Sequence, residues 1–123
     1  MSATGYLREL KTHYLGLANP TRLAILTLLA KREMAASELT RKLKLSQPLT
    51  SWHLRIMRRA GLIATRRSGR EVFCSLDRKT IAEYQERLNR LLAPRVPSVA
   101  KTASDEGDGV QPAALVEEIA SAI

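Results

Sequence analysis

Cysteine and long apolar runs are scarce in this sequence, and each scarcity excludes a class of protein. Cys74 is the only cysteine among 123 residues, so an intramolecular disulfide and a zinc site built from several thiolates are both excluded. Charged residues interrupt the apolar stretches before they reach the roughly 18 residues that a membrane-spanning helix needs. The N-terminus also lacks a basic segment followed by an apolar core and a cleavage site. We therefore expect a soluble, cytoplasmic protein.

Motifs of catalysis are absent as well. The chain has no glycine-rich nucleotide loop, no nucleophile motif and no pair of histidines at metal-ligand spacing. We expect no enzymatic activity and no cofactor.

The length allows one compact domain and a tail.

Acidic residues are few in most of the chain. Residues 1–95 carry 19 Lys and Arg against 7 Asp and Glu, a net charge of +12, whereas residues 96–123 carry 1 against 5, a net charge of −4. Such an excess of positive charge is typical of a domain that binds a polyanion, with nucleic acid as the first candidate and an anionic membrane as the second. We predict a folded domain over 1–95. The polar composition of 96–123 predicts an acidic, largely disordered tail, at whose end a short helix could form.

Apolar spacing predicts two helices at the start of the chain. Leucines and Tyr14 recur at helical intervals over residues 6–17. Asn19 and Pro20 predict the next helix start, because Asn caps free backbone N–H groups and proline has no N–H to leave unsatisfied. The helix that follows is apolar on almost every side, which predicts burial between other helices.

Two shorter helices follow with a tight connection. One spans 36–43, and the other spans 47–60 with Ser46 as its N-cap and Gly61 just beyond its end. Two short helices joined this closely, the second rich in polar and basic residues, are typical of a helix-turn-helix.

β-prone residues replace the helical pattern after Gly61. The runs 62–65 and 72–76 flank the basic stretch 66–71, which predicts a hairpin with a positively charged tip. Asp77 then begins a fifth helix that stops at Pro94. The order ααααββα predicts a mainly α fold with a small β-hairpin, which is a winged helix-turn-helix.

The outer side of the 47–60 helix is predicted to face DNA. At about 100° per residue, Leu49, His53 and Met57 lie on an inner arc and mostly polar residues lie on the outer one. Glutamine and arginine can read base edges, and arginines on a wing can reach phosphates. The predicted DNA-binding residues are Gln47, Pro48, Ser51, Trp52, Arg55, Arg66, Arg67 and Arg70. The alternatives are a solvated polar face and, for Trp52, packing against a partner subunit or the wing.

The first and fifth helices carry apolar stripes that favour a homodimer. A winged helix of about 95 residues has a small core, and these stripes exceed what its central helices can cover. The predicted dimer-interface residues are Leu7, Leu10, Tyr14, Leu17, Ile81, Tyr84, Leu88 and Leu91. Alternatively, both stripes pack within one subunit.

With these motifs the sequence resembles the ArsR-type winged-helix repressors over about residues 6–92. The matching segments are 17–26, 37–39, 45–48, Ser51, 53–54, 59–63, 66–70 and 72–73. The resemblance implies a homodimer that binds an imperfect inverted repeat in a promoter and is released by an effector. Double-stranded DNA is therefore the expected partner, and we expect no membrane partner.

The sequence departs from this family where many members bind metals. The two positions of the family's Cys-x-Cys box in the third helix are Ala35 and Ser37, and neither provides a thiolate for soft ions. A second family site between the last helices needs histidine, and residues 77–94 contain none. We therefore expect no metal at either site. The effector stays open among a small molecule in the dimer cleft, oxidation of Cys74, a protein partner and control by abundance alone.

The cysteine and the histidines each have two interpretations. Cys74 could be a redox sensor, but strand alternation places it on the apolar face with Val72 and Leu76, which favours a core thiol. His53 is expected to be a hydrogen-bonded core group, and His13 an ordinary surface histidine. The same basic charge would also suit a nonspecific or architectural DNA-binding protein, and a protein-interaction module is a third class.

Overall fold

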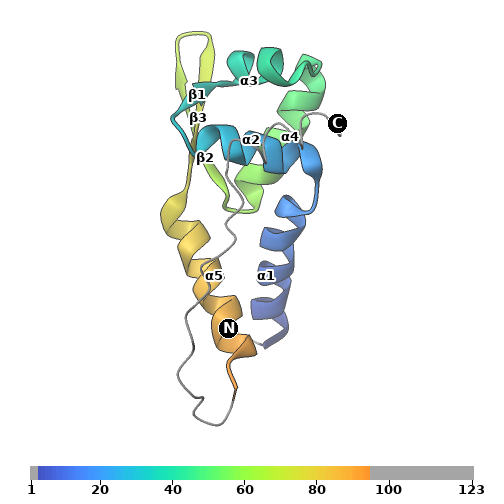
Figure 1. The fold of residues 1–123 in the computed structure, drawn as a ribbon, viewed down its shortest axis with the longest axis vertical. Coiled ribbons are helices and arrows are strands. Elements are labelled where there is room, and N and C mark those ends of the chain that lie inside the picture. The colour runs from blue at the N-terminus through green and yellow to red at the C-terminus, as the bar shows by residue number, and fades with distance from the viewer. Residues whose placement is uncertain (1–2, 95–123) are drawn as a thin grey trace, which may run out of the picture.

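A computed structural model of the chain describes residues 3–94, which form five helices and a three-stranded antiparallel sheet. The elements, in order, are α1 (Ala3–Leu17), α2 (Pro20–Leu29), β1 (Met34–Ala35), α3 (Ala36–Leu43), α4 (Gln47–Arg59), β2 (Ile63–Ser68), β3 (Glu71–Leu76) and α5 (Arg78–Leu92). In Figure 1, α1 and α5 project from one end of the molecule, and α3 and the β2–β3 hairpin lie at the other end. The predicted tail over 96–123 lies outside the described residues.

Three side chains begin helices as predicted. Asn19 accepts a hydrogen bond from the Arg22 backbone N–H at 3.1 Å, and Ser46 accepts one from the Leu49 N–H at 3.2 Å. Asp77 accepts the corresponding bond from Thr80 at 3.1 Å. Because each side chain satisfies a backbone donor that has no partner inside the helix, local sequence alone sets where α2, α4 and α5 begin.

Gly61 ends α4 as predicted. Its φ of +76° lies in the left-handed region, and a Cβ there would lie 2.7 Å from Thr80 Cγ2 at the start of α5. Both the backbone conformation and the close approach of α5 therefore require glycine.

The predicted hairpin is confirmed, but its strands are longer than expected. β2 and β3 pair from Ile63–Leu76 to Ser68–Glu71, which leaves only Gly69 and Arg70 as the turn. Arg66 and Arg67 therefore lie within β2 and not at the tip. Alternation in a strand points them to opposite faces of the sheet, so they cannot have the same neighbours.

The sheet contains a third strand that the sequence did not predict. β1 pairs with β3 through Met34–Cys74 and Ala35–Phe73, giving the order β1-β3-β2. A strand of two residues is too short to show alternation, and only its partner reveals it.

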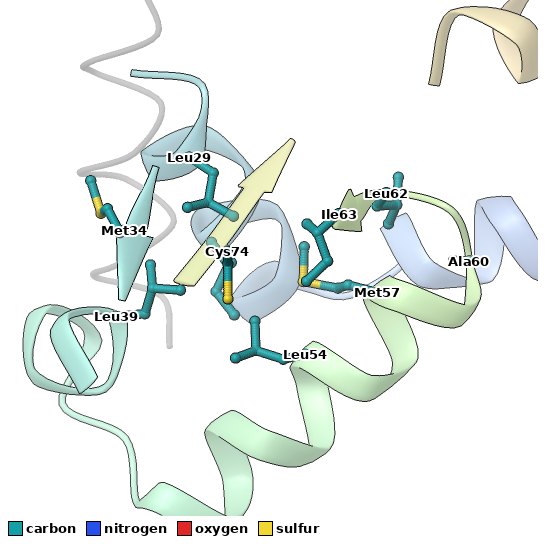
Figure 2. Packing of buried hydrophobic residues seen from close by; sticks show 10 residues of the cluster. Leu29, Met34, Leu39, Leu54, Met57, Ala60, Leu62, Ile63 and Cys74 are labelled. Carbon is teal, nitrogen blue, oxygen red and sulfur yellow. The ribbon is translucent and has the colours of Figure 1, made fainter. Parts of the chain in front are cut away.

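The core lies where α2, α3 and α4 meet the sheet. Figure 2 shows Leu39, Leu54, Met57 and Cys74 pointing toward one another from these elements. Cys74 is fully buried, and burial raises the pKa of its thiol to about 11. This burial confirms the prediction that Cys74 is a core residue. A protonated, inaccessible thiol is also a poor nucleophile.

Candidate nucleic-acid interface

The outer arc of α4 is exposed along its length. The side chains of Gln47, Pro48, Ser51, Trp52 and Arg55 all lie at the surface, and 49% of Trp52 is accessible. The ring of Trp52 makes an edge contact with His53 at 5.4 Å between centroids. The helix thus presents polar, basic and aromatic groups together on the side that the sequence indicated.

The inner arc differs from prediction in the first turn of α4. Leu49 was expected inside and is 41% exposed, whereas Thr50 is 2% exposed. The Thr50 hydroxyl accepts a hydrogen bond from Thr40 of α3 at 2.9 Å and donates one to the Ser46 carbonyl at 3.0 Å. The prediction for Leu49 was wrong, because Thr50, through its contact with α3, is the residue of this turn that is buried.

A groove of about 350 Å³ separates α4 from the wing. Ser51, Arg55 and Arg58 line it from α4, and Thr65 and Arg67 line it from β2. None of its three arginines forms an ion pair within residues 3–94. Free guanidinium groups beside hydroxyl donors are well suited to bind phosphate oxygens.

Sequence reasoning missed two residues of this groove, Arg58 and Thr65. Arg58 follows Arg55 by three residues, so continuing the outer arc through the last turn of α4 would have found it. Thr65 shares a strand face with Arg67, which becomes informative only when the hairpin register is known.

Arg66, predicted to bind DNA, has a different partner. Its guanidinium donates two hydrogen bonds to the Glu33 carboxylate, at 3.1 and 2.8 Å, and lies 4.7 Å from the centre of the Phe73 ring. This hydrogen-bonded pair lowers the pKa of Glu33. Arg66 therefore holds the wing to the segment before β1, while Arg70 lies exposed in the turn.

A buried arginine connects the end of α1 to α4. Arg22 donates to the carbonyl oxygens of Gly16 at 2.8 Å and Leu15 at 3.1 Å, and its Nη1 lies 3.2 Å from His53 Nδ1. The carbonyls at a helix C-terminus carry partial negative charge, which stabilises the buried cation. Desolvation, and then the charge of Arg22, lower the pKa of His53. The prediction that His53 is a hydrogen-bonded core group is confirmed.

His13 forms a second connection between α1 and α4, and here the prediction of a surface histidine was wrong. Its side chain is 1% exposed, its Nδ1 lies 2.7 Å from the Ala60 carbonyl oxygen, and its ring stacks on Tyr84 of α5 at 4.1 Å. Gly16 permits this approach, since a Cβ at Gly16 would lie 2.6 Å from Ala60 Cβ. The apolar pattern of α1 could not predict that His13 is buried, because its burial depends on contacts with α5 and with the end of α4, which are distant in sequence.

In the single chain, some of the predicted dimer-interface residues are buried or half-buried, and the others are exposed. Leu10 is 7% exposed, and Leu17 and Ile81 pack against the core. The Tyr14 hydroxyl donates to the Tyr84 carbonyl, and Tyr14 and Leu88 are half-buried. The apolar surface that stays open on α1 and α5 consists of Leu7, Leu15, Leu91 and Leu92, of which Leu15 and Leu92 were not predicted.

The described part of the chain provides no grouping of three His, Cys, Asp or Glu side chains suited to a metal ion. None of the helices described is both long and apolar enough to cross a membrane.

Five helices with a capped helix-turn-helix and a wing define the class of winged helix-turn-helix proteins. The family of bacterial regulatory proteins called arsR matches residues 19–65. The transcriptional activator HlyU of Vibrio cholerae is 40% identical over 75 residues, which cover 61% of this chain and 69% of HlyU. The chain belongs to the ArsR family of transcriptional regulators.

Two further similarities agree with this membership. A biofilm growth-associated repressor of Agrobacterium fabrum is 38% identical over 72 residues, covering 58% of this chain and 62% of the repressor. A solved structure of HlyU superposes with a TM-score of 0.57 at 34% identity, covering 76% of this chain and 100% of HlyU.

Proposed function

We propose that the protein is a homodimeric repressor of transcription that binds an inverted-repeat operator in a promoter, in the cytoplasm. The observation that supports this most strongly is the groove between α4 and the wing, with two hydroxyls and three arginines that form no ion pair with any described residue. In the proposed complex α4 enters the major groove, and the wing follows the flanking backbone. A dimer would present two such helices about one turn of DNA apart.

The proposed contacts divide by what they recognise. Gln47, Ser51 and Arg55 on the exposed side of α4 are placed to read base edges, and Trp52 to contact the groove wall. Arg58, Arg67 and Arg70 are assigned to phosphates. Arg66 is left out of this set because Glu33 neutralises its charge.

A comparison of the protein's affinities for the operator and for random DNA distinguishes this proposal from a nonspecific or architectural role. Operator fragments would first be selected from genomic DNA by the purified protein. Arg55→Ala should cost roughly 1–3 kcal/mol on the operator and much less on random DNA. Equal losses on both would make Arg55 a phosphate contact, and equal affinity of the unaltered protein for both would refute sequence-specific binding.

The dimer interface is proposed on the open apolar surface of α1 and α5. Leu7 is 53% and Leu91 is 48% exposed in the single chain, and apolar side chains left open in a monomer can be buried by a second copy of the chain. Leu91→Glu should give folded monomers with weak operator binding in analytical ultracentrifugation and anisotropy. Leu23→Glu on α2, also at an exposed leucine, is the matched control. A dimer that survives both Leu91→Glu and the corresponding Leu7→Glu would place the interface elsewhere.

We also propose that no metal at the two family sites controls DNA binding. At the third-helix site Ala35 is buried and Ser37 donates to Glu71 at 3.0 Å, so neither provides a soft ligand. Titration of zinc, cadmium, nickel and arsenite against the protein–operator complex tests this. Stoichiometric release by any one of them would refute it.

A further inference from the structure

A second cavity, of about 370 Å³, lies where α1 and α5 meet the end of α4, and its lining shares no residue with the groove beside the wing. Its volume falls within the roughly 300–1,000 Å³ of small-molecule sites. The wall includes Arg8, Thr12 and His13 of α1, Arg59 of α4 and Tyr84 of α5. Three elements that are distant in sequence therefore contribute chemically distinct groups to one hollow.

The protonation of His13 follows from its hydrogen bond. A carbonyl oxygen accepts and cannot donate, so the hydrogen between Nδ1 and the Ala60 oxygen belongs to the ring. Desolvation lowers the pKa of His13, so the ring is neutral near pH 7 and Nε2 keeps a lone pair. His13 therefore has one free hydrogen-bond acceptor.

That acceptor faces the cavity. No described group forms a hydrogen bond with Nε2, although every fully buried side-chain nitrogen or oxygen among the residues described has a partner. Nε2 must therefore be the accessible atom of a ring that is otherwise buried, and the cavity is the space that His13 lines. A ligand that matches this atom has to bring an O–H or N–H donor.

The rim of the cavity is positively charged. Arg8 and Arg59 are exposed and form no ion pair within the described range, whereas the Glu9 carboxylate is already bound by Arg87 at 3.0 Å. Two unpaired guanidinium groups favour an anion. The Tyr84 ring also lines the cavity, where it stacks on the His13 ring at 4.1 Å between centroids.

We propose that this cavity binds a small organic acid that also carries a hydroxyl group. The hydroxyl donates to His13 Nε2, and the acid group pairs with Arg8 and Arg59. Such a ligand would contact α1, α4 and α5 together, beside the Ala60 carbonyl at the C-terminal end of α4. A role as effector rests on the DNA binding proposed above, whereas ligand binding itself does not.

The full-length protein without DNA tests the site by isothermal titration calorimetry. The probes are 4-hydroxybenzoate, benzoate, which lacks the donor, and phenol, which lacks the anion. We expect 4-hydroxybenzoate to bind at least about tenfold more tightly than either, because a site with a buried polar group rejects ligands that leave it unpaired. No binding of 4-hydroxybenzoate, or equal affinity for 4-hydroxybenzoate and benzoate, would overturn the proposal.

Variants separate the two halves of the site. His13→Asn keeps a donor near the Nδ1 position for Ala60 and removes Nε2, so it should abolish the preference for 4-hydroxybenzoate over benzoate. Arg59→Gln should weaken both acids alike, and Arg41→Gln, an exposed arginine of α3, should change neither. If His13→Asn does not fold, Arg8→Gln and Arg59→Gln decide, since unchanged affinity in both would refute the site.

The effector role has a separate readout. Saturating 4-hydroxybenzoate should change the Kd of the protein–operator complex by at least about threefold, measured by fluorescence anisotropy. Ligand binding with an unchanged Kd overturns the effector role alone. Failure to bind any operator would instead refute the proposed function and leave the calorimetric result intact.

Discussion

The groove beside the wing and the contacts on the other side of the molecule, between α1 and its neighbouring helices, use arginine differently. Arg55, Arg58 and Arg67 line an open groove and have no carboxylate partner in the part of the chain that the structure describes. On the other side, Arg22 is buried against carbonyl oxygens, and Arg87 pairs with Glu9 beside two tyrosine rings. Unpaired arginines are available to an external anion, whereas paired ones hold helices together. Basic composition alone therefore does not identify which arginines bind nucleic acid.

Replacing Arg22 should have the largest effect on stability. Arg22→Met leaves two carbonyls at the end of α1 and the His53 ring without their donor, which should cost roughly 2–4 kcal/mol of unfolding free energy. Urea unfolding followed by circular dichroism measures this. Arg58→Met is the matched control and should change stability by less than about 0.5 kcal/mol. Similar costs at the two positions would contradict the division between structural and free arginines.

Closing the gap between α1 and α4 should have the next largest effect. In Gly16→Ala the added methyl group would lie 2.6 Å from Ala60 Cβ, so the helices must separate, at a cost of roughly 1–3 kcal/mol. The change should also weaken operator binding more than its loss of stability explains, because α1 holds the end of α4. A fully stable variant would show that α1 and α4 are not tightly docked.

Acidification should loosen the α1–α4 connection before it affects the carboxylates. The folded-state pKa values of His13 and His53 lie below their ordinary value of 6.5. The unfolded chain therefore binds more protons as the pH falls through about 6.5, and the unfolding free energy decreases. Urea titrations between pH 7.5 and 5 measure this slope, which His53→Gln should reduce. A stability that is constant across this interval would contradict the burial of both rings.

The smallest effect on DNA binding is expected at Arg66. Arg67→Ala should weaken binding to all sequences and lower the salt slope by about one, because one phosphate contact is lost. Arg66→Ala should leave the salt slope unchanged, since Glu33 already neutralises this side chain. Anisotropy titrations at several salt concentrations compare the two. Equal changes in slope would mean that Arg66 leaves Glu33 to bind DNA.

Local signals determined much of the fold. The caps at Asn19, Ser46 and Asp77 act over three residues, and Gly61 needs its conformation whatever surrounds it. The sequence therefore predicted where helices begin and end, the hairpin and the exposed side of α4.

Tertiary structure decided the rest, because the partners are remote in sequence. His13 meets Ala60 across 47 residues, Arg22 meets His53 across 31, and Arg66 meets Glu33 across 33. The two-residue strand β1 exists only by pairing with β3. A hydrogen bond or ion pair is short-ranged and directional, so a helical or alternating pattern shows which face a side chain occupies but not which distant group it meets there. Composition and periodicity predicted a DNA-binding surface, and only the packing of α1 and α5 on α4 produced the cavity beside His13.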